Sequence, residues 1–220
     1  MAARTTFEHE LSELNLELIK MGCLIEDAIE NSILAFKNQD KILASQVING
    51  DGEVDDMEKQ IEARCLRLIL RQQPVARDLR IISTAQKIIT DMERIGDNAE
   101  DIARISTEIR GEYAFEMVKH IPEMSRTAVE MVHNSLKAFV NCDLELAKRT
   151  IEQDDVVDNL FCNIKADLAQ ILREDKDKDS NTIDLLLIAK YLERIADHAV
   201  NICEWVEFSK TGERKNNKIL

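Results

Sequence analysis

The amino-acid sequence predicts an all-α fold of two tandem, similar, antiparallel three-helix bundles. The composition favours helices, because hydrophobic residues make up 45% of the 220 residues, whereas aromatic residues make up 4% and there are only six Gly and two Pro. An internal repeat divides the chain, since residues 31–61 match residues 134–164 at a shift of 103. Self-similarity at so long a period indicates a duplicated domain rather than a solenoid. We therefore expect one bundle at residues 1–111 and another at residues 112–220, the second with a short polar C-terminal tail.

The first half is predicted to contain helices near residues 7–38, 40–71 and 76–110. Asn38 is suited to close the first helix, and Asp40 is suited to cap the start of the second. Gly50 and Gly52 fall inside the second helix and weaken the prediction that it is continuous. Pro74 stands just before the third helix, where a missing N–H costs little.

The second half is predicted to contain helices near residues 117–141, 143–173 and 181–209. Asn141 and Asp143 repeat the closing and capping pair of the first half, and Pro122 stands near the start of the first of these helices. The charged run at residues 174–181 is typical of a solvated linker. The tail from Lys210 is polar and basic, and we expect it to fray.

Charge and hydropathy exclude several classes of partner. The net charge of -13 disfavours a phosphate-neutralising surface, so we expect no nucleic-acid partner. The longest purely apolar stretch, residues 185–189, is too short to span a bilayer, so we expect no direct membrane insertion. Charged residues interrupt the first twenty positions, which excludes a signal peptide and indicates a cytoplasmic protein. The scattered cysteines are expected to be buried thiols in a reducing cytosol: Cys23, Cys65, Cys142, Cys162 and Cys203.

The repeat includes a chemical motif in the last helix of each half. Residues 93–102 read Glu-Arg-Ile-Gly-Asp-Asn-Ala-Glu-Asp-Ile, and residues 193–202 read Glu-Arg-Ile-Ala-Asp-His-Ala-Val-Asn-Ile. Four residues turn a helix through about 400°, so side chains spaced by four drift only about 40° per step and climb one face. We call these the first ladder (Glu93, Asp97, Asp101) and the second ladder (Glu193, Asp197, Asn201). Carboxylates stacked in this way repel one another unless a cation or a partner's basic residue lies among them. In the preceding helix of each half, the repeat also returns Asp51 and Asp55 as Asp154 and Asp158.

Two interpretations of the ladders stay open. A helical wheel places the ladders opposite the aliphatic stripe, outside the bundle, which excludes a ferritin-like interior site with paired Glu-x-x-His motifs; that spacing occurs here once, in Glu130 and His133. The ladders therefore predict metal sites, with iron, manganese, magnesium or zinc as the candidates; oxygen ligands favour hard cations over zinc. The first ladder should bind more strongly, because it has one more carboxylate. The alternative is a solvated acidic face, which a pairing of Arg104 with Glu100 would support.

The sequence shows no active-site motif. It contains no nucleophile elbow, no Gly-rich phosphate loop and no zinc-hydrolase motif, so we expect a protein that is not an enzyme. His198 is expected to be a partly buried packing residue, and Trp205 and Phe208 are expected to pack near the end of the last helix.

These features together resemble the PhoU family of bacterial phosphate-signalling regulators. The resemblance rests on two three-helix halves that each end in Glu-Arg-Ile-x-Asp-x-Ala, and it covers residues 7 to 209 approximately. Supporting phrases are Met21-Gly22, Asp40 at the start of the second helix, Gln-Gln-Pro-Val-Ala-Arg-Asp-Leu-Arg at residues 72–80, and the run at residues 192–204.

The resemblance implies a cytoplasmic, non-enzymatic adaptor that represses the phosphate-starvation response. Its partners would be the ATPase of the phosphate ABC transporter and a sensor histidine kinase, and we also expect a homodimer. The resemblance further implies metal clusters on Glu93, Asp97, Asp101, Glu193 and Asp197. Asn201 replaces the acid at the third position of the second ladder, where Glu204 could compensate. The alternative function is a metal-handling or storage protein built from a helical bundle.

Overall fold

The computed structural model describes residues 2–72, 74, 76–109, 119–174, 179–214 and 217–218. Within these residues the chain forms the helices α1 (Ala2–Asn38), α2 (Lys41–Gln72), α3 (Ala76–Glu108), α4 (Ile121–Asn141), α5 (Leu144–Glu174) and α6 (Asp179–Thr211). The predicted all-α class and helix order are therefore confirmed. Parts of the predicted helices at residues 110 and 117–118, and the predicted domain boundary at residues 111 and 112, lie outside the described residues.

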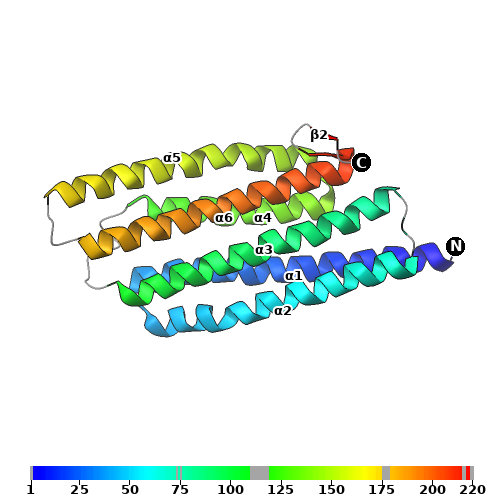
Figure 1. The fold of residues 1–220 in the computed structure, drawn as a ribbon, viewed down its shortest axis with the longest axis horizontal. Coiled ribbons are helices and arrows are strands. Elements are labelled where there is room, and N and C mark those ends of the chain that lie inside the picture. The colour runs from blue at the N-terminus through cyan, green and yellow to red at the C-terminus, as the bar shows by residue number, and fades with distance from the viewer. Residues whose placement is uncertain are drawn as a thin grey trace.

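The helices form two antiparallel three-helix bundles that lie side by side with nearly parallel long axes (Figure 1). One bundle contains α1, α2 and α3, and the other contains α4, α5 and α6. The bundles meet where α3 packs against α6 and where α1 packs against α4, so α2 and α5 form the outer edges. The predicted pair of similar bundles is confirmed.

The two halves use the same device to join their first and second helices. Asp40 and Asp143 each accept two backbone N–H bonds from the first turn of the following helix, at 2.9 and 3.0 Å for Asp40 and at 3.1 and 3.0 Å for Asp143. The residues before them, Gln39 and Cys142, adopt left-handed φ values of 52° and 53°. Both predicted caps are confirmed. The α2 helix is also continuous through Gly50 and Gly52.

One continuous hydrophobic core joins the two bundles. The predicted aliphatic stripes are confirmed, since Ile95, Ile102, Ile195 and Ile202 are all fully buried. Every helix contributes to this core; examples are Leu14, Ile61, Met92, Met131, Ile164 and Leu192. Because each bundle covers an apolar face of the other, the burial that stabilises one half depends on the other half being folded.

Two expectations are corrected. The tail was expected to fray, but β1 (Glu213–Arg214) and β2 (Asn217–Lys218) form a short antiparallel hairpin against the end of α6. Gly212, with a φ of 80°, makes the left-handed turn into this hairpin. The cysteines are free, but only Cys65 and Cys203 are buried, and burial raises both thiol pKa values to about 12. Cys142 is half-buried, whereas Cys23 and Cys162 are exposed.

None of the described helices is apolar over a sufficient length to cross a membrane.

Candidate functional site

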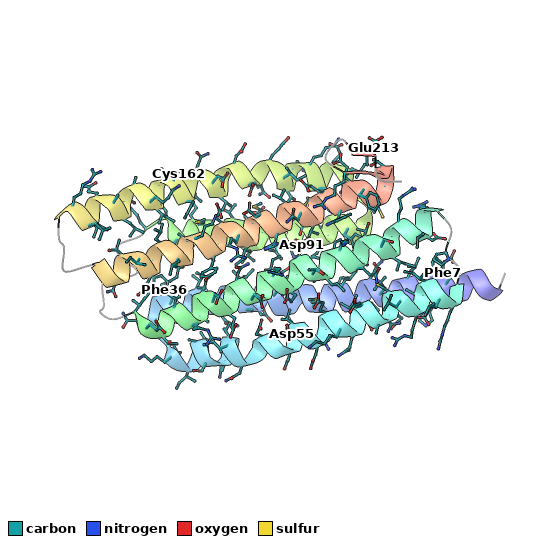
Figure 2. All side chains as sticks on the ribbon, viewed as in Figure 1. Phe7, Phe36, Asp55, Asp91, Cys162 and Glu213 are labelled. Atoms are coloured by element: carbon teal, nitrogen blue, oxygen red, sulfur yellow. The ribbon has the colours of Figure 1, made fainter. Side chains whose placement is uncertain are left out.

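The acidic side chains of the first half gather where α2 packs against α3. Glu93 and Asp97 come from α3, and Asp51 and Asp55 face them from α2. Figure 2 marks Asp55 where α2 runs beside α3. We call these four residues the first acidic groove. They lie outside the hydrophobic core, as the helical wheel predicts, and they differ in exposure: Glu93 has 25% of its side chain exposed, whereas Asp55 has 45%.

Electrostatic strain is concentrated at Asp51. Burial and, after it, the charges of Glu100, Asp97, Asp55 and Asp101 together raise its pKa to about 6. The pKa values of Glu93 and Asp97 are also raised, mainly by burial; neighbouring carboxylates add to this shift, whereas the Arg94 guanidinium opposes it. A carboxylate whose pKa is raised by other carboxylates lies where positive charge is in short supply. The first acidic groove would therefore be stabilised by a bound cation.

The second half repeats this arrangement between α5 and α6. The second acidic groove consists of Asp154 and Asp158 from α5 with Glu193 and Asp197 from α6. Burial, followed by the charges of the other three residues, raises the pKa of Asp154 to about 6. The Oδ1 atom of Asp154 is buried and, in the part of the chain that the structure describes, has no hydrogen-bond partner. Such an acceptor is costly unless it is paired, so it marks a position where a cation would fit.

The carboxylates contributed by α2 and α5 are functional candidates that the sequence interpretation missed. Asp51, Asp55, Asp154 and Asp158 were recognised only as markers of the repeat. Their recurrence was the available signal, because duplicated acids that pack against duplicated acids concentrate negative charge. The sequence alone did not reveal which face of α2 packs against α3.

The third position of each ladder turns away from its groove, towards the other half. The Tyr191 hydroxyl on α6 donates to Asp101 on α3. Asn201 on α6 donates to Asp91 on α3 at 3.3 Å, and its Oδ1 accepts a bond from Arg214 at 3.5 Å. The drift of about 40° per step explains this, because two steps rotate the side chain by about 80°, from the neighbouring helix of the same bundle to the other bundle. The ladders thus supply two groove residues each and one residue at the junction between the halves.

The remaining candidates from the sequence, His198, His133 and Arg104, pair with carboxylates of the protein. His198 is half-buried, as expected, and its Nδ1 lies 2.9 Å from Asp91, which Figure 2 marks where α3 and α6 run side by side. His133 pairs with Glu26 of α1 at 3.2 Å. The predicted Arg104–Glu100 pair is present.

Near the end of α6, Trp205 and Phe208 pack edge to face with ring centres 5.5 Å apart, as expected for packing residues. Glu204, the residue offered as compensation for Asn201, pairs instead with Arg214 at 3.1 Å.

The grooves can hold a metal only after side-chain rearrangement. Among the described residues, no three His, Cys, Asp or Glu side chains are already positioned to bind one ion. The donor set is nevertheless suitable, since all groove residues are carboxylates, which hard cations prefer. Asp158 and Asp197 are exposed and Asp55 has 45% of its side chain exposed, which leaves these side chains room to change rotamer.

The comparisons with known proteins all point to one family. The family profile described as "PhoU domain" matches residues 18–106 and 121–206, one match in each half. A "Phosphate-specific transport system accessory protein PhoU homolog" from Clostridium acetobutylicum is 41% identical over 212 residues, which cover 96% of this chain and 97% of the relative. The "Phosphate-specific transport system accessory protein PhoU" of Escherichia coli is 33% identical over 207 residues, which cover 94% of this chain and 86% of the relative.

Solved structures agree with this result. The crystal structure of PhoU from Pseudomonas aeruginosa matches with a TM-score of 0.85 and 31% identity, covering 94% of this chain and all of the other. The structure of "the phosphate transport system regulatory protein PhoU" from Streptococcus pneumoniae matches with a TM-score of 0.84 and 28% identity, covering 94% and 98% of the two chains.

Proposed function

Because this chain belongs to the PhoU family, we propose that it regulates phosphate transport and represses the phosphate-starvation response. The names of its relatives describe accessory and regulatory proteins of a phosphate transport system, which supports a role without catalysis. We place it in the cytoplasm, in contact with the ATPase of the phosphate ABC transporter and with a sensor histidine kinase. We also propose that the protein forms a homodimer.

We further propose that each acidic groove binds metal. The observation that carries this proposal is the repeated convergence of four carboxylates; burial and the charges of the neighbouring acids together raise the pKa of Asp51 and of Asp154 to about 6. In the second groove, the buried Oδ1 of Asp154, which has no hydrogen-bond partner among the described residues, supports the same role. The oxygen donors favour iron, manganese or magnesium over zinc. At the ends of the ladders, ligation by Asp101 and Asn201 stays a prediction, since both contact the opposite half.

The geometry supports an adaptor better than a storage protein. A storage protein needs an enclosed interior that collects many ions, but aliphatic side chains fill the interior here. The acidic grooves instead lie outside this core, between α2 and α3 and between α5 and α6, where a bound cation would tie each pair of helices together. Long helices with fixed spacing present extended surfaces to a partner, and a charge at the groove would favour one docking geometry over others.

A deletion strain tests the regulatory role. If the protein represses the starvation response, its loss should leave phosphate-starvation genes expressed in phosphate-rich medium. Expression should return to the repressed level when the intact chain is supplied from a plasmid. Unchanged expression in the deletion strain would rule out the regulatory proposal.

Elemental analysis of the purified protein tests the metal proposal. The Asp97→Asn/Asp197→Asn variant should lose most of the metal that copurifies with the intact chain, without loss of fold, because both side chains lie outside the core. A charge-matched control is Glu30→Gln/Glu123→Gln, since both side chains are exposed on α1 and α4. Equal metal content in all three proteins would leave the solvated acidic face as the better explanation.

A further inference from the structure

The C-terminal hairpin places Arg214 against the last turns of α6. The centre of its guanidinium lies 3.9 Å from the centre of the Trp205 ring. Its Nη2 atom donates to Glu204 at 3.1 Å and to Asn201 at 3.5 Å. We call Asn201, Glu204 and Trp205 the arginine notch. An aromatic face, a carboxylate and an amide oxygen together recognise the planar, forked shape of a guanidinium, which the ammonium of lysine lacks.

The hairpin that delivers Arg214 is weakly anchored. Each of its strands has two residues, and β2 pairs with β1 but contacts none of the described helices. Strands of this length are marginal by themselves. The Arg214 Nε atom is buried and, within the described structure, has no hydrogen-bond partner, although its side chain is 23% exposed overall. Arg214 therefore fills the notch without using all of its donors, and the unmade bond opposes its burial.

The notch is a feature of the second half alone. At the repeat shift of 100, its three residues correspond to Asp101, Arg104 and Ile105, which offer no aromatic face. Arg104 pairs with Glu100 of its own helix. The notch is thus not a by-product of the duplicated fold, and it differs from the metal candidates, which are duplicated.

We propose that the arginine notch is a docking site for an arginine on a basic segment of a partner protein, and that the hairpin covers it until that arginine displaces Arg214. The net charge of -13 favours the approach of a basic segment. The proposal depends on the adaptor role only in that an adaptor has a partner, and it does not depend on metal in the acidic grooves.

The experiment uses the full-length Arg214→Ala variant and the intrinsic fluorescence of Trp205, the one tryptophan in the chain. The probe is a synthetic peptide of residues 211–220, compared with the same peptide carrying lysine in place of its arginine. The arginine peptide should change the fluorescence saturably and bind the variant at least about tenfold more tightly than the lysine peptide. It should bind the intact chain more weakly than the variant, because Arg214 competes.

Two further variants separate the notch from a general effect on the hairpin. Glu213→Ala, in the same strand with an exposed side chain, should behave as the intact chain. Arg214→Lys should bind the arginine peptide as Arg214→Ala does, and circular dichroism should show that both variants stay folded. Equal binding of the two peptides to Arg214→Ala, or equal binding of the arginine peptide to that variant and the intact chain, would overturn the proposal. Either result leaves the deletion-strain test of the regulatory role untouched.

Discussion

Each acidic groove contains four carboxylates at equivalent positions, but the two grooves differ in the residues beside them. Next to the first groove, α2 carries Glu58, whose carboxylate accepts a bond from Thr90 at 3.4 Å. At the corresponding positions of the second half stand Phe161 and Lys190. The Lys190 ammonium pairs with Glu193 and lies 5.5 Å from the centre of the Phe161 ring. The first groove thus continues as an acidic surface, whereas the second ends at a lysine.

This difference bears on the prediction that the first groove binds metal more strongly than the second. The sequence predicts a stronger first site because Asp101 adds a carboxylate. Asp101 accepts a bond from Tyr191 of the other half, yet its charge still raises the pKa of Asp51 and Asp97. The structure adds a second reason. Each groove has one cation paired with the first residue of its ladder, Arg94 with Glu93 at 3.4 Å and Lys190 with Glu193, but the Glu58 carboxylate lies beside the first groove where the second half has Phe161. Duplication kept the carboxylates that could bind a cation and changed the residues that set their charge balance.

The largest expected effect tests whether the halves are independent. Met92 and Leu192 are equivalent under the repeat, and both are fully buried. Met92→Ala and Leu192→Ala should each lower the free energy of unfolding by about 2–5 kcal/mol, because each leaves a cavity in the core. Since one core joins the halves, each variant should unfold in urea in a single transition, monitored by circular dichroism. Two separate transitions, with only one shifted in each variant, would show that the bundles are independent domains.

A smaller effect concerns pH. The carboxyl pKa values of Asp51 and Asp154 rise from 3.8 to about 6 on folding. A raised acid pKa stabilises the fold fully below pH 3.8, and this contribution is lost as the pH rises through about 6. In metal-free protein, Asp51→Asn or Asp154→Asn should therefore increase stability at pH 7 by about 1 kcal/mol each after allowance for solvent screening.

Urea unfolding with a chelator present, at pH 4 and pH 7, measures this effect. The intact chain should lose stability between the two values, and each Asn variant should lose less. Because the two shifts are alike, the two variants should respond alike. Parallel pH profiles for the variants and the intact chain would contradict the proposed origin of the strain.

The helices and their caps could be predicted from the sequence because they depend on local signals. Asp40 and Asp143 act within four residues of their position, and the aliphatic spacing around Ile95 and Ile195 reports one helix face directly. The grooves depend on which faces of two helices meet, which one helical wheel does not contain. The position of Arg214 was not predicted because a polar, basic tail gives no periodic signal, and its partner Trp205 appears in the sequence as an ordinary packing residue.

The Lys190 ammonium, which would compete with a bound metal for Glu193, gives a third prediction. Lys190→Ala should increase the metal affinity of the second groove about three- to tenfold, because Glu193 loses its internal partner and becomes available to the ion. Isothermal titration with Mn²⁺ should then show two sites of more similar affinity than in the intact chain. The matched control is Lys165→Ala, which removes an ammonium that lies 4.5 Å from the centre of the same Phe161 ring. If both variants change the affinity equally, the effect comes from net charge and not from the Glu193 pair.

The smallest effect is expected at Gly96, where the second half has Ala196. A Cβ at position 96 would lie 3.2 Å from Val54 Cγ1 and 3.3 Å from Asp51 Oδ1, slightly too close to both. Alanine is favoured over glycine in a helix by about 1 kcal/mol, and the neighbouring side chains must move by a few tenths of an ångström to gain it. Both are side-chain ends, and the fold already accommodates a Cβ at Ala196, which is fully buried.

Gly96→Ala should therefore stabilise the protein by no more than about 0.5 kcal/mol, as measured by urea unfolding. Because the new methyl group displaces the Asp51 carboxylate, Mn²⁺ binding at the first groove should weaken while binding at the second is unchanged. The reverse substitution, Ala196→Gly, is the control, and it should destabilise the protein without weakening the first groove. A loss of more than about 1 kcal/mol in Gly96→Ala would mean that Asp51 and Val54 cannot move. In that case the first groove would be too rigid to assemble a metal site by rotamer changes, and the glycine would be required for close packing of α2 on α3.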